Sequence, residues 1–427
     1  MKILLVTRGS QGDVLPYLAV AEELRRRGHE VTLNVPSLFE ASVKSYGFRY
    51  VLQPFDDIKG MIDDAGQKKQ GFRPFLKWTR AVIDTQFEQL PSLVKQHDLV
   101  ISTNSEFAAP SIAEYCEKPL IRTGYAPLLP SKHIRPATLP FQRPNPLLPP
   151  ALLWKVMNRL TNLMVKETIN KQRQQLGMTP IVNFGYHAGS HSLNYLMYSP
   201  QIGETDPDWP FPWEIGGYCF NDSFSYEEPA YQTLLRFVES GSDPILFFTL
   251  GSCSAKEGHR FCQMLLESCR KLGFRLLIGS GWSQTGIQLQ TNDRLFLMTQ
   301  PLPHHLLLSH CQGVIHHGGC GTTHSVARAG KPQLLTPLLL DQPYWAYRVE
   351  RLGIGPSALR IGKATQREVD RKVEQLMTDS NLQRQAEQLG QRFGLSRAFA
   401  TSAITSNRQK EPILTRNRYY SINNNKF

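Results

Sequence analysis

The chain has 427 residues, too many for one ordinary domain, so its length predicts two or three domains. Hydrophobic residues make up 41% of the sequence and charged residues 20%, values that are typical of globular proteins and exclude wholesale disorder. The formal net charge of +12 favours an acidic partner: a nucleic acid, an anionic membrane surface or a phosphorylated substrate. Because no RNA-recognition, KH or zinc-finger signature accompanies this charge, we expect no nucleic-acid partner.

Cysteine usage and hydropathy indicate the compartment. Seven cysteines are scattered without a C-x-x-C pair, which predicts a reduced, cytoplasmic chain and not a disulfide framework. The apolar run at residues 3–6 is too short for the core of a signal peptide. No stretch reaches the roughly 18 apolar residues of a spanning helix, so we expect at most a peripheral contact with an anionic membrane.

The first 35 residues have the pattern of a βαβ unit. The apolar run at 3–6 predicts a buried parallel strand, and residues 9–13 a loop. Residues 16–27 have helical spacing and end at Gly28, and a second strand is expected over 29–35. Such a unit predicts a doubly wound α/β domain whose functional site lies at the carboxyl ends of the strands.

The middle of the chain changes character. Strands are expected at 98–102 and from 119, but residues 125–153 are rich in proline, which excludes a helix or a central strand. We expect a long ordered loop or a lid over an apolar pocket, followed by a helix near 154–175.

The α/β pattern restarts after a second segment rich in proline and aromatic residues, at 206–213, which is typical of a stiff linker. Strands are then expected at 244–250, 275–278, 294–298, 313–315 and 333–336, with helices near 256–272 and 318–329. We therefore predict an N-terminal domain over 1–205, a linker over 206–226 and a C-terminal domain over 227–387. A helix near 388–405 is expected to pack back on the first domain, ahead of a mobile tail at 407–427.

A glycine-rich turn follows a strand at residues 314–323, which read Val-Ile-His-His-Gly-Gly-Cys-Gly-Thr-Thr. Helix N-termini expose free N–H groups that bind anions, and glycines let the backbone approach a phosphate closely. His317 stands where an imidazole can donate a hydrogen bond to a phosphate oxygen. The pattern favours a phosphate site, while a tight turn with small packing residues is the alternative.

The same region suits a metal site less well than a phosphate site. The histidines and cysteines of 310–324 match no standard zinc spacing, so we expect no metal there. Asp206 and Asp208 are expected to lie in a solvated turn of the linker. Asp341 and Gln342 follow an apolar strand, where they suit either the hydroxyls of a sugar or the cap of the next helix.

Together these motifs resemble glycosyltransferase family one. The run from Pro303 to Gly355, with HHGGCGTT and LDQPYWA, is similar to its nucleotide-sugar signature, and GSQGDVLP at 9–16 matches the branch of sterol 3-β-glucosyltransferases and bacterial natural-product glycosyltransferases. The resemblance implies a GT-B fold, in which two Rossmann-like domains face each other across a cleft. It places the donor on the C-terminal domain and the acceptor on the N-terminal domain.

The resemblance also implies roles for single residues. His317 would contact the α-phosphate of the donor. The remaining donor-site residues would be Ser252 near the phosphates, Trp282 near the nucleotide, Leu302 near the base, Gly319, Gly321, Thr322 and Thr323 at the diphosphate, and Asp341 and Gln342 on the sugar hydroxyls.

Asp13 is the implied catalytic base. An acceptor hydroxyl must lose its proton as it attacks the anomeric carbon, and a carboxylate at the end of the first strand can take that proton. A dry cleft would raise its pKa to the range that proton transfer needs. From the residues alone, Asp13 is also a candidate cap of the helix that follows.

The resemblance implies inversion of the anomeric centre without a metal ion and without a cofactor beyond the nucleotide sugar. UDP-glucose is the favoured donor, ahead of TDP sugars, and the acceptor is expected to be apolar: a sterol, a terpenoid, a lipid or an aromatic natural product. Trp78, His133 and Trp154 are the candidate acceptor residues, and His187 is a candidate proton relay. For both histidines, a structural or surface role is the alternative.

Three other functions remain as alternatives. A nucleotide-sugar 2-epimerase shares the two-domain plan but needs an acid–base constellation that the sequence does not display. A dinucleotide oxidoreductase needs a GxGxxG motif, which residues 9–16 lack. A binding protein that kept the fold without catalysis would be distinguished by the absence of donor hydrolysis.

Overall fold

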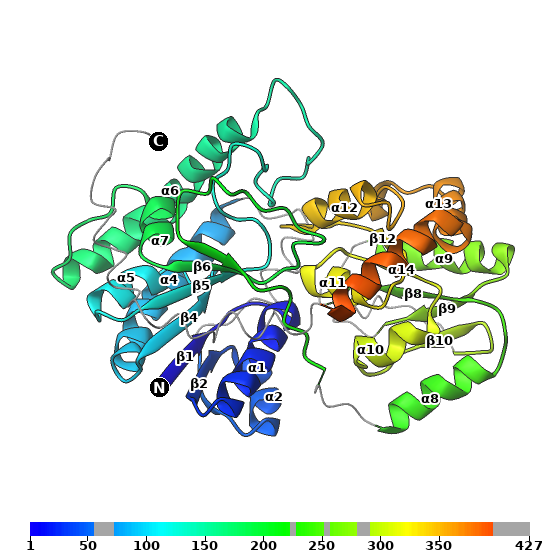
Figure 1. Ribbon diagram of the computed structural model, residues 1–427, viewed down its shortest axis with the longest axis horizontal. Coiled ribbons are helices and arrows are strands. Elements are labelled where there is room, and N and C mark those ends of the chain that lie inside the picture. The colour runs from blue at the N-terminus through cyan, green and yellow to red at the C-terminus, as the bar shows by residue number, and fades with distance from the viewer. Residues whose placement is uncertain (55–71, 223–227, 252–256, 280–290, 396–427) are drawn as a thin grey trace.

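The computed structural model describes residues 1–54, 72–222, 228–251, 257–279 and 291–395. In this part of the chain two parallel sheets, each covered by helices, lie beside each other (Figure 1). The α/β architecture expected from the sequence is confirmed. Ser252, Trp282 and the tail at 407–427, which the sequence analysis singled out, lie outside the described residues.

The first sheet has seven strands in the order β3-β2-β1-β4-β5-β6-β7, and every neighbouring pair is parallel. Its strands are β1 (Lys2–Val6), β2 (Glu30–Val35), β3 (Arg49–Leu52), β4 (Leu99–Thr103), β5 (Leu120–Gly124), β6 (Leu193–Leu196) and β7 (Trp213–Ile215). The accompanying helices are α1 (Gln11–Arg26), η1 (Ser37–Phe39), α2 (Glu40–Ser45), α4 (Phe72–Lys95), α5 (Ala109–Tyr115), α6 (Pro150–Gln175) and α7 (Phe184–Ser190).

The second sheet has five strands in the order β10-β9-β8-β11-β12, again all parallel. Its strands are β8 (Ile245–Thr249), β9 (Arg275–Ile278), β10 (Leu295–Leu297), β11 (Gly313–His316) and β12 (Gln333–Leu335). Its helices are α8 (Glu228–Glu239), α9 (Gly258–Leu272), α10 (His304–Leu307), η2 (Leu308–His310), α11 (Cys320–Arg328), α12 (Gln342–Arg351), η3 (Ile361–Lys363), α13 (Gln366–Thr378) and α14 (Ser380–Leu395).

The central strands are apolar without alternation because helices cover both faces of each sheet. In β1, Ile3 and Leu5 contribute to the core on one face, while Leu4 and Val6 contribute to the core on the other. All five residues of β8 are buried in the same way. This explains why the strands could be located from short apolar runs.

Helix α1 begins earlier than expected, at Gln11 in place of residue 16, so the loop predicted over 9–13 is wrong. Ser10 caps the helix, since its side chain accepts from the N–H of Gly12 and its own N–H donates to the Asp13 carboxylate. This reciprocal capping box starts the helix despite Pro16, which lies inside it.

The segment 206–226, expected to be a linker, contains β7. Pro210 and Pro212 precede this strand, which lies at the edge of the first sheet, where a missing backbone N–H is tolerated. The prolines therefore mark an edge strand and not only a stiff connection. The predicted domain boundaries themselves stay a prediction.

The two halves share one hydrophobic core. Tyr198 from the first half packs edge-on against Trp345 of α12, with ring centroids 5.8 Å apart. The N–H of Ser199 donates to Nε2 of His324 in α11 at 3.0 Å, and the N–H of Glu204 donates to the hydroxyl of Tyr344 at 2.8 Å. These contacts fix α11 and α12 against the first half.

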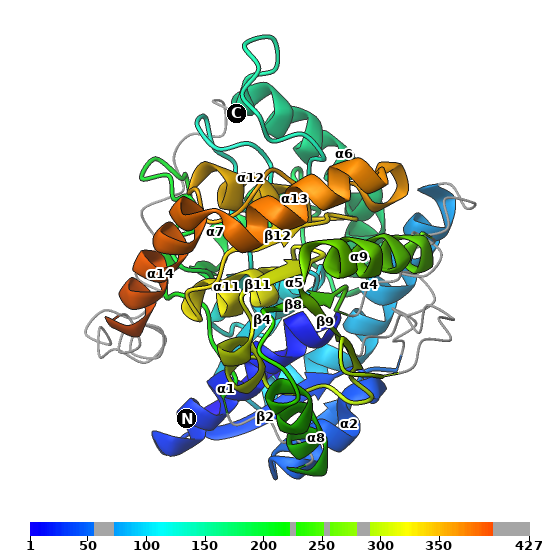
Figure 2. The same ribbon diagram turned by 90° about the vertical axis from the view of Figure 1, so that its right-hand side faces the viewer.

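The last described helix, α14, starts before the helix expected near 388–405 and packs against α11 of the second half. Figure 2 shows α13 and α14 in front of the second sheet, with α13 beside α9. Residues 396–405 lie outside the described part of the chain. None of the described helices has the length and hydropathy needed to cross a membrane.

Candidate functional site

Asp13 is held in one position at the start of α1. Its Oδ2 accepts a hydrogen bond from the backbone N–H of Ser10 at 2.7 Å and from the Ser10 hydroxyl at 3.2 Å. Gly9 has φ +140°, and a Cβ at this position would lie 2.1 Å from Oδ2 of Asp13. Glycine is therefore the residue at position 9 that leaves room for the Asp13 carboxylate.

The environment of Asp13 suits a base. Desolvation by the surrounding protein raises the pKa of Asp13 to about 6, against the lowering effect of the two Ser10 hydrogen bonds, and the negative charge of Asp341 contributes to the rise. Asp341 belongs to the other half of the chain, so a charge from the second half acts on the carboxylate of the first half. Asp13 is not the cap of α1, which is Ser10, but its carboxylate completes the capping box from the N3 position, and the same carboxylate is the one that Asp341 influences.

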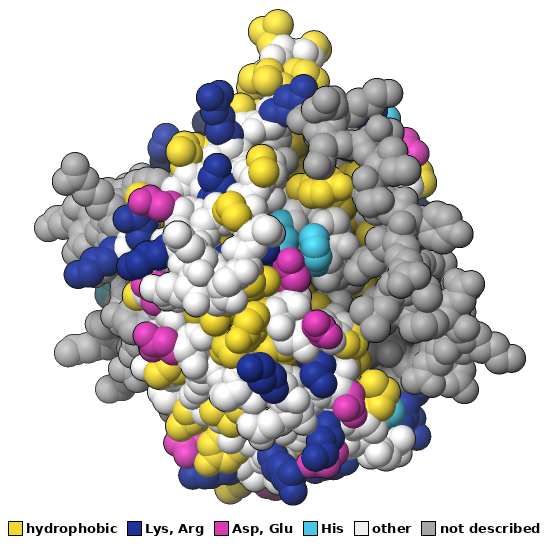
Figure 3. All heavy atoms as spheres, turned by 90° about the vertical axis from the view of Figure 1, so that its left-hand side faces the viewer, with side chains coloured by type: hydrophobic (Ala, Val, Ile, Leu, Met, Phe, Trp, Pro, Cys, Tyr) yellow, Lys and Arg dark blue, Asp and Glu magenta, His cyan; other side chains and the backbone are white. Residues whose placement is uncertain are grey.

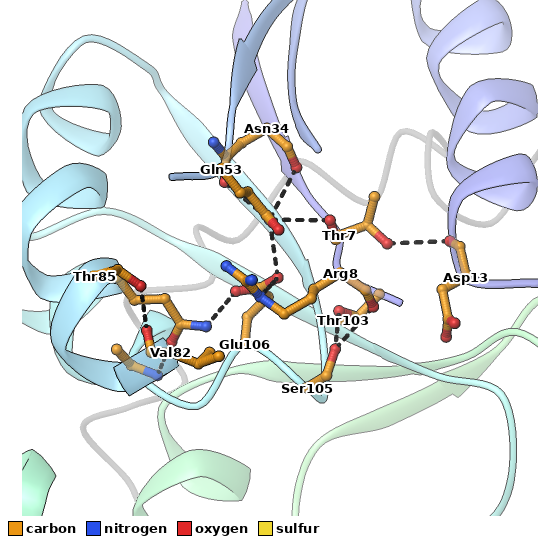
Figure 4. Close-up of polar contacts among 12 residues, drawn as sticks. Thr7, Arg8, Asp13, Asn34, Gln53, Val82, Thr85, Thr103, Ser105 and Glu106 are labelled. Atoms are coloured by element: carbon orange, nitrogen blue, oxygen red, sulfur yellow. Dashed lines mark hydrogen bonds and ion pairs between the residues drawn. The ribbon is translucent and has the colours of Figure 1, made fainter. Parts of the chain in front are cut away.

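A buried polar network, which the sequence analysis missed, supports the backbone around Asp13. Glu106 is fully buried, lies 3.7 Å from the Nε of Arg8, and accepts hydrogen bonds from Gln53 at 3.3 Å and Gln86 at 2.5 Å. Figure 4 shows the Asp13 carboxylate pointing away from this network, while its backbone carbonyl accepts from Thr7. The signal in the sequence was a charged residue two or three residues after a buried strand: Arg8 after β1 and Glu106 after β4.

A second anchor on Asp13 comes from the start of the proline-rich segment. The Tyr125 hydroxyl donates to the Asp13 carbonyl at 3.0 Å, and the Thr7 hydroxyl donates to the same carbonyl at 3.1 Å. Thr7, directly after β1, and Tyr125, directly after β5, thus hold the Asp13 backbone, and the helix cap Ser10 holds its carboxylate.

His317 lies between two glycines at the end of β11. A Cβ on Gly251 would lie 2.7 Å from its ring, and a Cβ on Gly319 would lie 2.5 Å from its Nε2. Burial lowers the pKa of His317 to about 4, so the imidazole is neutral at pH 7. Its Nδ1 is buried without a hydrogen-bond partner among the described residues, so this nitrogen can bond to a ligand at the turn.

The N-terminus of α11 adjoins His317. Gly319 is the N-cap, and no described side chain caps the helix, so its first N–H groups are available to an anion. The Thr323 hydroxyl is used inside the helix, since it donates to the Gly319 carbonyl at 2.9 Å, while Thr322 is partly exposed. A larger residue would not fit at position 321, because a Cβ on Gly321 would lie 2.5 Å from the Tyr218 hydroxyl.

Asp341 and Gln342 lie at the turn between β12 and α12. Oδ2 of Asp341 accepts from Nε1 of Trp345 at 2.8 Å, and burial raises the pKa of Asp341 to about 6. Asp341 is the N-cap residue of α12 by position, but its side chain makes no capping hydrogen bond. Oε1 of Gln342 accepts from the N–H groups of Leu338 and Leu339, which fixes the turn.

The remaining donor residue, Leu302, has its side chain in a hydrophobic core cluster of the second half. This placement does not test the backbone contact to a base that the resemblance implies. Ser252 and Trp282, the other two residues expected near the nucleotide, lie outside the described residues.

The structure does not gather the three expected acceptor residues around Asp13. Trp154 is buried, and its Nε1 donates to the Ile134 carbonyl at 2.8 Å, which ties α6 to the proline-rich segment. Trp78 packs on Phe75 within α4, with ring centroids 6.2 Å apart. His133 is 67% exposed and lies 3.9 Å from an Asp208 oxygen.

His187, the candidate relay, is buried beside the Ser111 hydroxyl at 3.2 Å, and desolvation lowers its pKa to about 3. It belongs to one of two groups among the described residues whose spacing suits a metal: Glu114 with His187 and His191, and His133 with Asp206 and Asp208. Glu114 already pairs with Arg173 at 2.7 Å.

Asp206 is buried and accepts from Ser131, so the expectation of a solvated turn is wrong for Asp206, while Asp208 is exposed in a turn as expected. The histidines upstream and downstream of His317 are also engaged. His316 pairs with Gln333 at 2.8 Å, and His324 bonds to the Cys320 carbonyl as well as to Ser199. Among the described residues, therefore, it is His317 whose ring nitrogen is available at the turn.

Two family models match the chain, one in its N-terminal part and one in its C-terminal part. Residues 3–118 match the model of the glycosyltransferase family 28 N-terminal domain. Residues 290–397 match the model of the erythromycin biosynthesis protein CIII-like C-terminal domain. The matches include Asp13 in the first case and His317, Asp341 and Gln342 in the second.

Similar proteins cover most of the chain. A sterol 3-beta-glucosyltransferase of Arabidopsis thaliana is 25% identical over 91% of this chain, which spans 62% of the length of that relative. Glycosyltransferase GtfE of Amycolatopsis orientalis is 29% identical over 83% of this chain and 85% of its own length. The crystal structure of the calicheamicin glycosyltransferase CalG4 aligns with a TM-score of 0.66 and 19% identity, over 94% of this chain and 97% of that one.

We predict that Trp154 stabilises the fold. Trp154→Phe leaves the buried Ile134 carbonyl without its donor and should lower the free energy of unfolding by about 1–2 kcal/mol. Denaturant unfolding measures this change. Trp78→Phe is the matched control, since the Trp78 Nε1 has no described partner and its removal should cost less. Equal losses in both variants would contradict the role given to the Trp154 hydrogen bond.

Proposed function

We propose that the chain, which is similar to GT-B glycosyltransferases along most of its length, transfers a hexose from a nucleoside diphosphate sugar to a hydroxyl of an apolar acceptor. We favour UDP-glucose as the donor and a sterol, terpenoid, lipid or aromatic natural product as the acceptor. The relative named as a sterol 3-beta-glucosyltransferase supports both the sugar and the acceptor class.

The observation that carries the proposal is the approach of Asp13 to Asp341. Asp13 belongs to the motif at 9–16 and Asp341 to the motif at 340–346, more than 300 residues later, yet the charge of Asp341 raises the pKa of Asp13. A sugar held by Asp341 and Gln342 would therefore present its anomeric carbon on the side where Asp13 meets the acceptor.

In the proposed reaction, Asp13 accepts the proton of the acceptor hydroxyl while that oxygen forms a bond to the anomeric carbon. The bond from that carbon to the diphosphate oxygen breaks on the opposite side, so the displacement inverts the anomeric centre. Charge that develops on the leaving diphosphate meets the N–H groups at the start of α11 and the imidazole of His317. These groups supply the stabilisation in a mechanism that we propose to be independent of metal ions.

The alternatives give different products. An epimerase would convert the free nucleotide sugar without an acceptor, and a binding protein would hold it unchanged. Nuclear magnetic resonance of the nucleotide sugar after incubation, with and without acceptor, separates these outcomes from transfer. A basic chain with an apolar acceptor also suits peripheral contact with an anionic membrane, and we include this contact in the proposal.

We expect Asp13→Asn to abolish transfer while leaving nucleotide affinity nearly unchanged. The amide keeps the size of the side chain but cannot accept the proton. Turnover with a panel of apolar acceptors and calorimetric nucleotide titration measure the two properties. Full turnover by the variant would remove Asp13 from the role of base.

The pH dependence of kcat/KM should report the Asp13 carboxyl. Because its pKa is raised to about 6, the carboxyl is protonated and inactive below that pH. The rate should therefore rise about tenfold per pH unit below pH 6 and level off above it. Ser10→Ala removes one hydrogen bond to the carboxylate and should move the profile to higher pH.

Ser105→Ala is the control for that profile. Ser105 belongs to the neighbouring polar network, where its hydroxyl contacts Thr103 and the Arg8 carbonyl but not Asp13. The profile of this variant should match that of the unmodified chain. A profile that is unchanged in Ser10→Ala would assign the titration to another group.

We expect His317→Ala to weaken nucleotide binding by about 1.5–3 kcal/mol, the usual cost of losing a hydrogen bond to a charged group. Calorimetry with UDP, TDP and GDP measures the loss and identifies the preferred base. His324→Ala is a poor control because it breaks the contact to Ser199, so His310→Ala, which lies in η2, is preferable. Unchanged affinity in His317→Ala would remove His317 from the phosphate site.

A further inference from the structure

The outward face of α6 carries an apolar stripe. Leu152, Val156, Leu160 and Leu163 are 45%, 48%, 45% and 70% exposed, and their spacing of four, four and three residues places them on one side of the helix. The outer face of a helix that covers a sheet is ordinarily polar. The opposite face of α6 packs on the core, so the exposed stripe does not contribute to that packing.

Basic side chains accompany the stripe. Lys155 and Arg159 are exposed and share its face, because they stand three and seven residues after Leu152. The segment 118–166, which contains the stripe, has eight lysines and arginines and not one aspartate or glutamate. This segment alone contributes +8 where the whole chain sums to +12.

The stripe continues into the proline-rich segment that precedes α6. Phe141 is 44% exposed and Leu147 84% exposed, and Arg143 is also exposed. Figure 1 shows the connection before α6 protruding at the top of the molecule, and Figure 3 shows hydrophobic side chains at that end with lysine and arginine side chains beside them. The same segment begins at Tyr125, whose hydroxyl holds the Asp13 carbonyl.

We propose that this face, formed by Leu152, Lys155, Val156, Arg159, Leu160 and Leu163, docks on the surface of an anionic lipid bilayer. The apolar side chains would enter the headgroup region, and the two cations would meet lipid phosphates and carboxylates. The proposal deepens the proposed function, since an acceptor dissolved in the bilayer would then lie next to the chain segment that leads to Asp13.

A second copy of the chain fits the α6 face less well than an anionic bilayer does. A symmetric dimer would place the same face on both sides of the interface, so Lys155 and Arg159 would oppose their own copies. Like charges at close range oppose association, whereas an anionic bilayer attracts them. The two exposed cations of the face, Lys155 and Arg159, therefore favour lipid.

Cosedimentation of the full chain with vesicles tests the proposal. One set of vesicles is pure phosphatidylcholine, and in the other about a third of the lipid is phosphatidylserine. We expect binding to the anionic vesicles, little binding to the neutral ones, and loss of binding at high salt because salt screens the attraction. Absence of binding to the anionic vesicles at low salt would overturn the docking face.

Two double variants separate the parts of the face. Lys155→Glu with Arg159→Glu should reduce partitioning onto anionic vesicles by at least about tenfold, as the contribution of each basic residue near the surface implies. Leu160→Ser with Leu163→Ser should reduce it by a similar factor and leave the salt dependence in place. All four residues are exposed, so neither variant should disturb the core.

Matched controls lie elsewhere on the chain. Arg360→Glu with Lys363→Glu changes charge by the same amount at exposed positions of the second half. Leu38→Ser removes a leucine that is 56% exposed in η1, which contacts α2, and Figure 1 shows α2 at the opposite end of the first half from α6. If the control variants lose vesicle binding as strongly as the α6 variants, the loss results from net charge or general hydropathy. That result would overturn the assignment of this face.

Nucleotide titration in lipid-free buffer keeps the two proposals distinguishable. If every variant binds nucleotide like the unmodified chain, loss of vesicle binding reports the docking face alone. If the unmodified chain binds vesicles but no nucleotide, the transferase proposal fails and the docking face stands. Light scattering without lipid shows whether the stripe joins two copies, and a dimer abolished by Leu160→Ser with Leu163→Ser would overturn the lipid assignment.

Discussion

The placement of one carboxylate, that of Asp13, is the constraint on which the rest of the site depends. Moving a charged group out of water is costly, so a carboxylate in this position needs hydrogen-bond donors, and Ser10 supplies two of them. Gly9 supplies the space, since any side chain there would collide with the carboxylate. The interaction that starts α1 therefore also holds the carboxylate that we propose as the base, and its pKa is raised.

The contact between the halves serves the site as well as the fold. Trp345 packs against Tyr198 from the first half, and its Nε1 donates to the Asp341 carboxylate. The side chain that closes the shared core thus also orients the partner of Asp13. A shift of one half relative to the other would change the separation of the two carboxylates and, with it, the pKa of Asp13.

The sequence was informative where the determinant is local. Continuous apolar runs located the buried strands, and short motifs pointed to Asp13, His317 and Asp341, which the structure places at strand ends and helix starts. It was uninformative where the determinant is a distant partner. The Arg8–Glu106 pair joins residues 98 positions apart, and the Trp154 hydrogen bond depends on where the chain before α6 folds back. Prolines misled at 206–226, because they are equally compatible with a linker and with an edge strand.

The net charge of +12 predicted an acidic partner without identifying it. The positions of the charged residues in the structure bear on which partner each part of the chain suits. At the turn proposed to hold the donor diphosphate, the groups brought together are backbone N–H groups and an imidazole that burial keeps neutral. Such groups stabilise an anion through dipoles, so the site does not draw on the basic surplus. That surplus is concentrated at 118–166, on the half proposed to receive the acceptor, and there it adjoins exposed leucines. Under the two proposals, dipoles would bind a small soluble anion, and lysine and arginine side chains would bind an extended anionic surface.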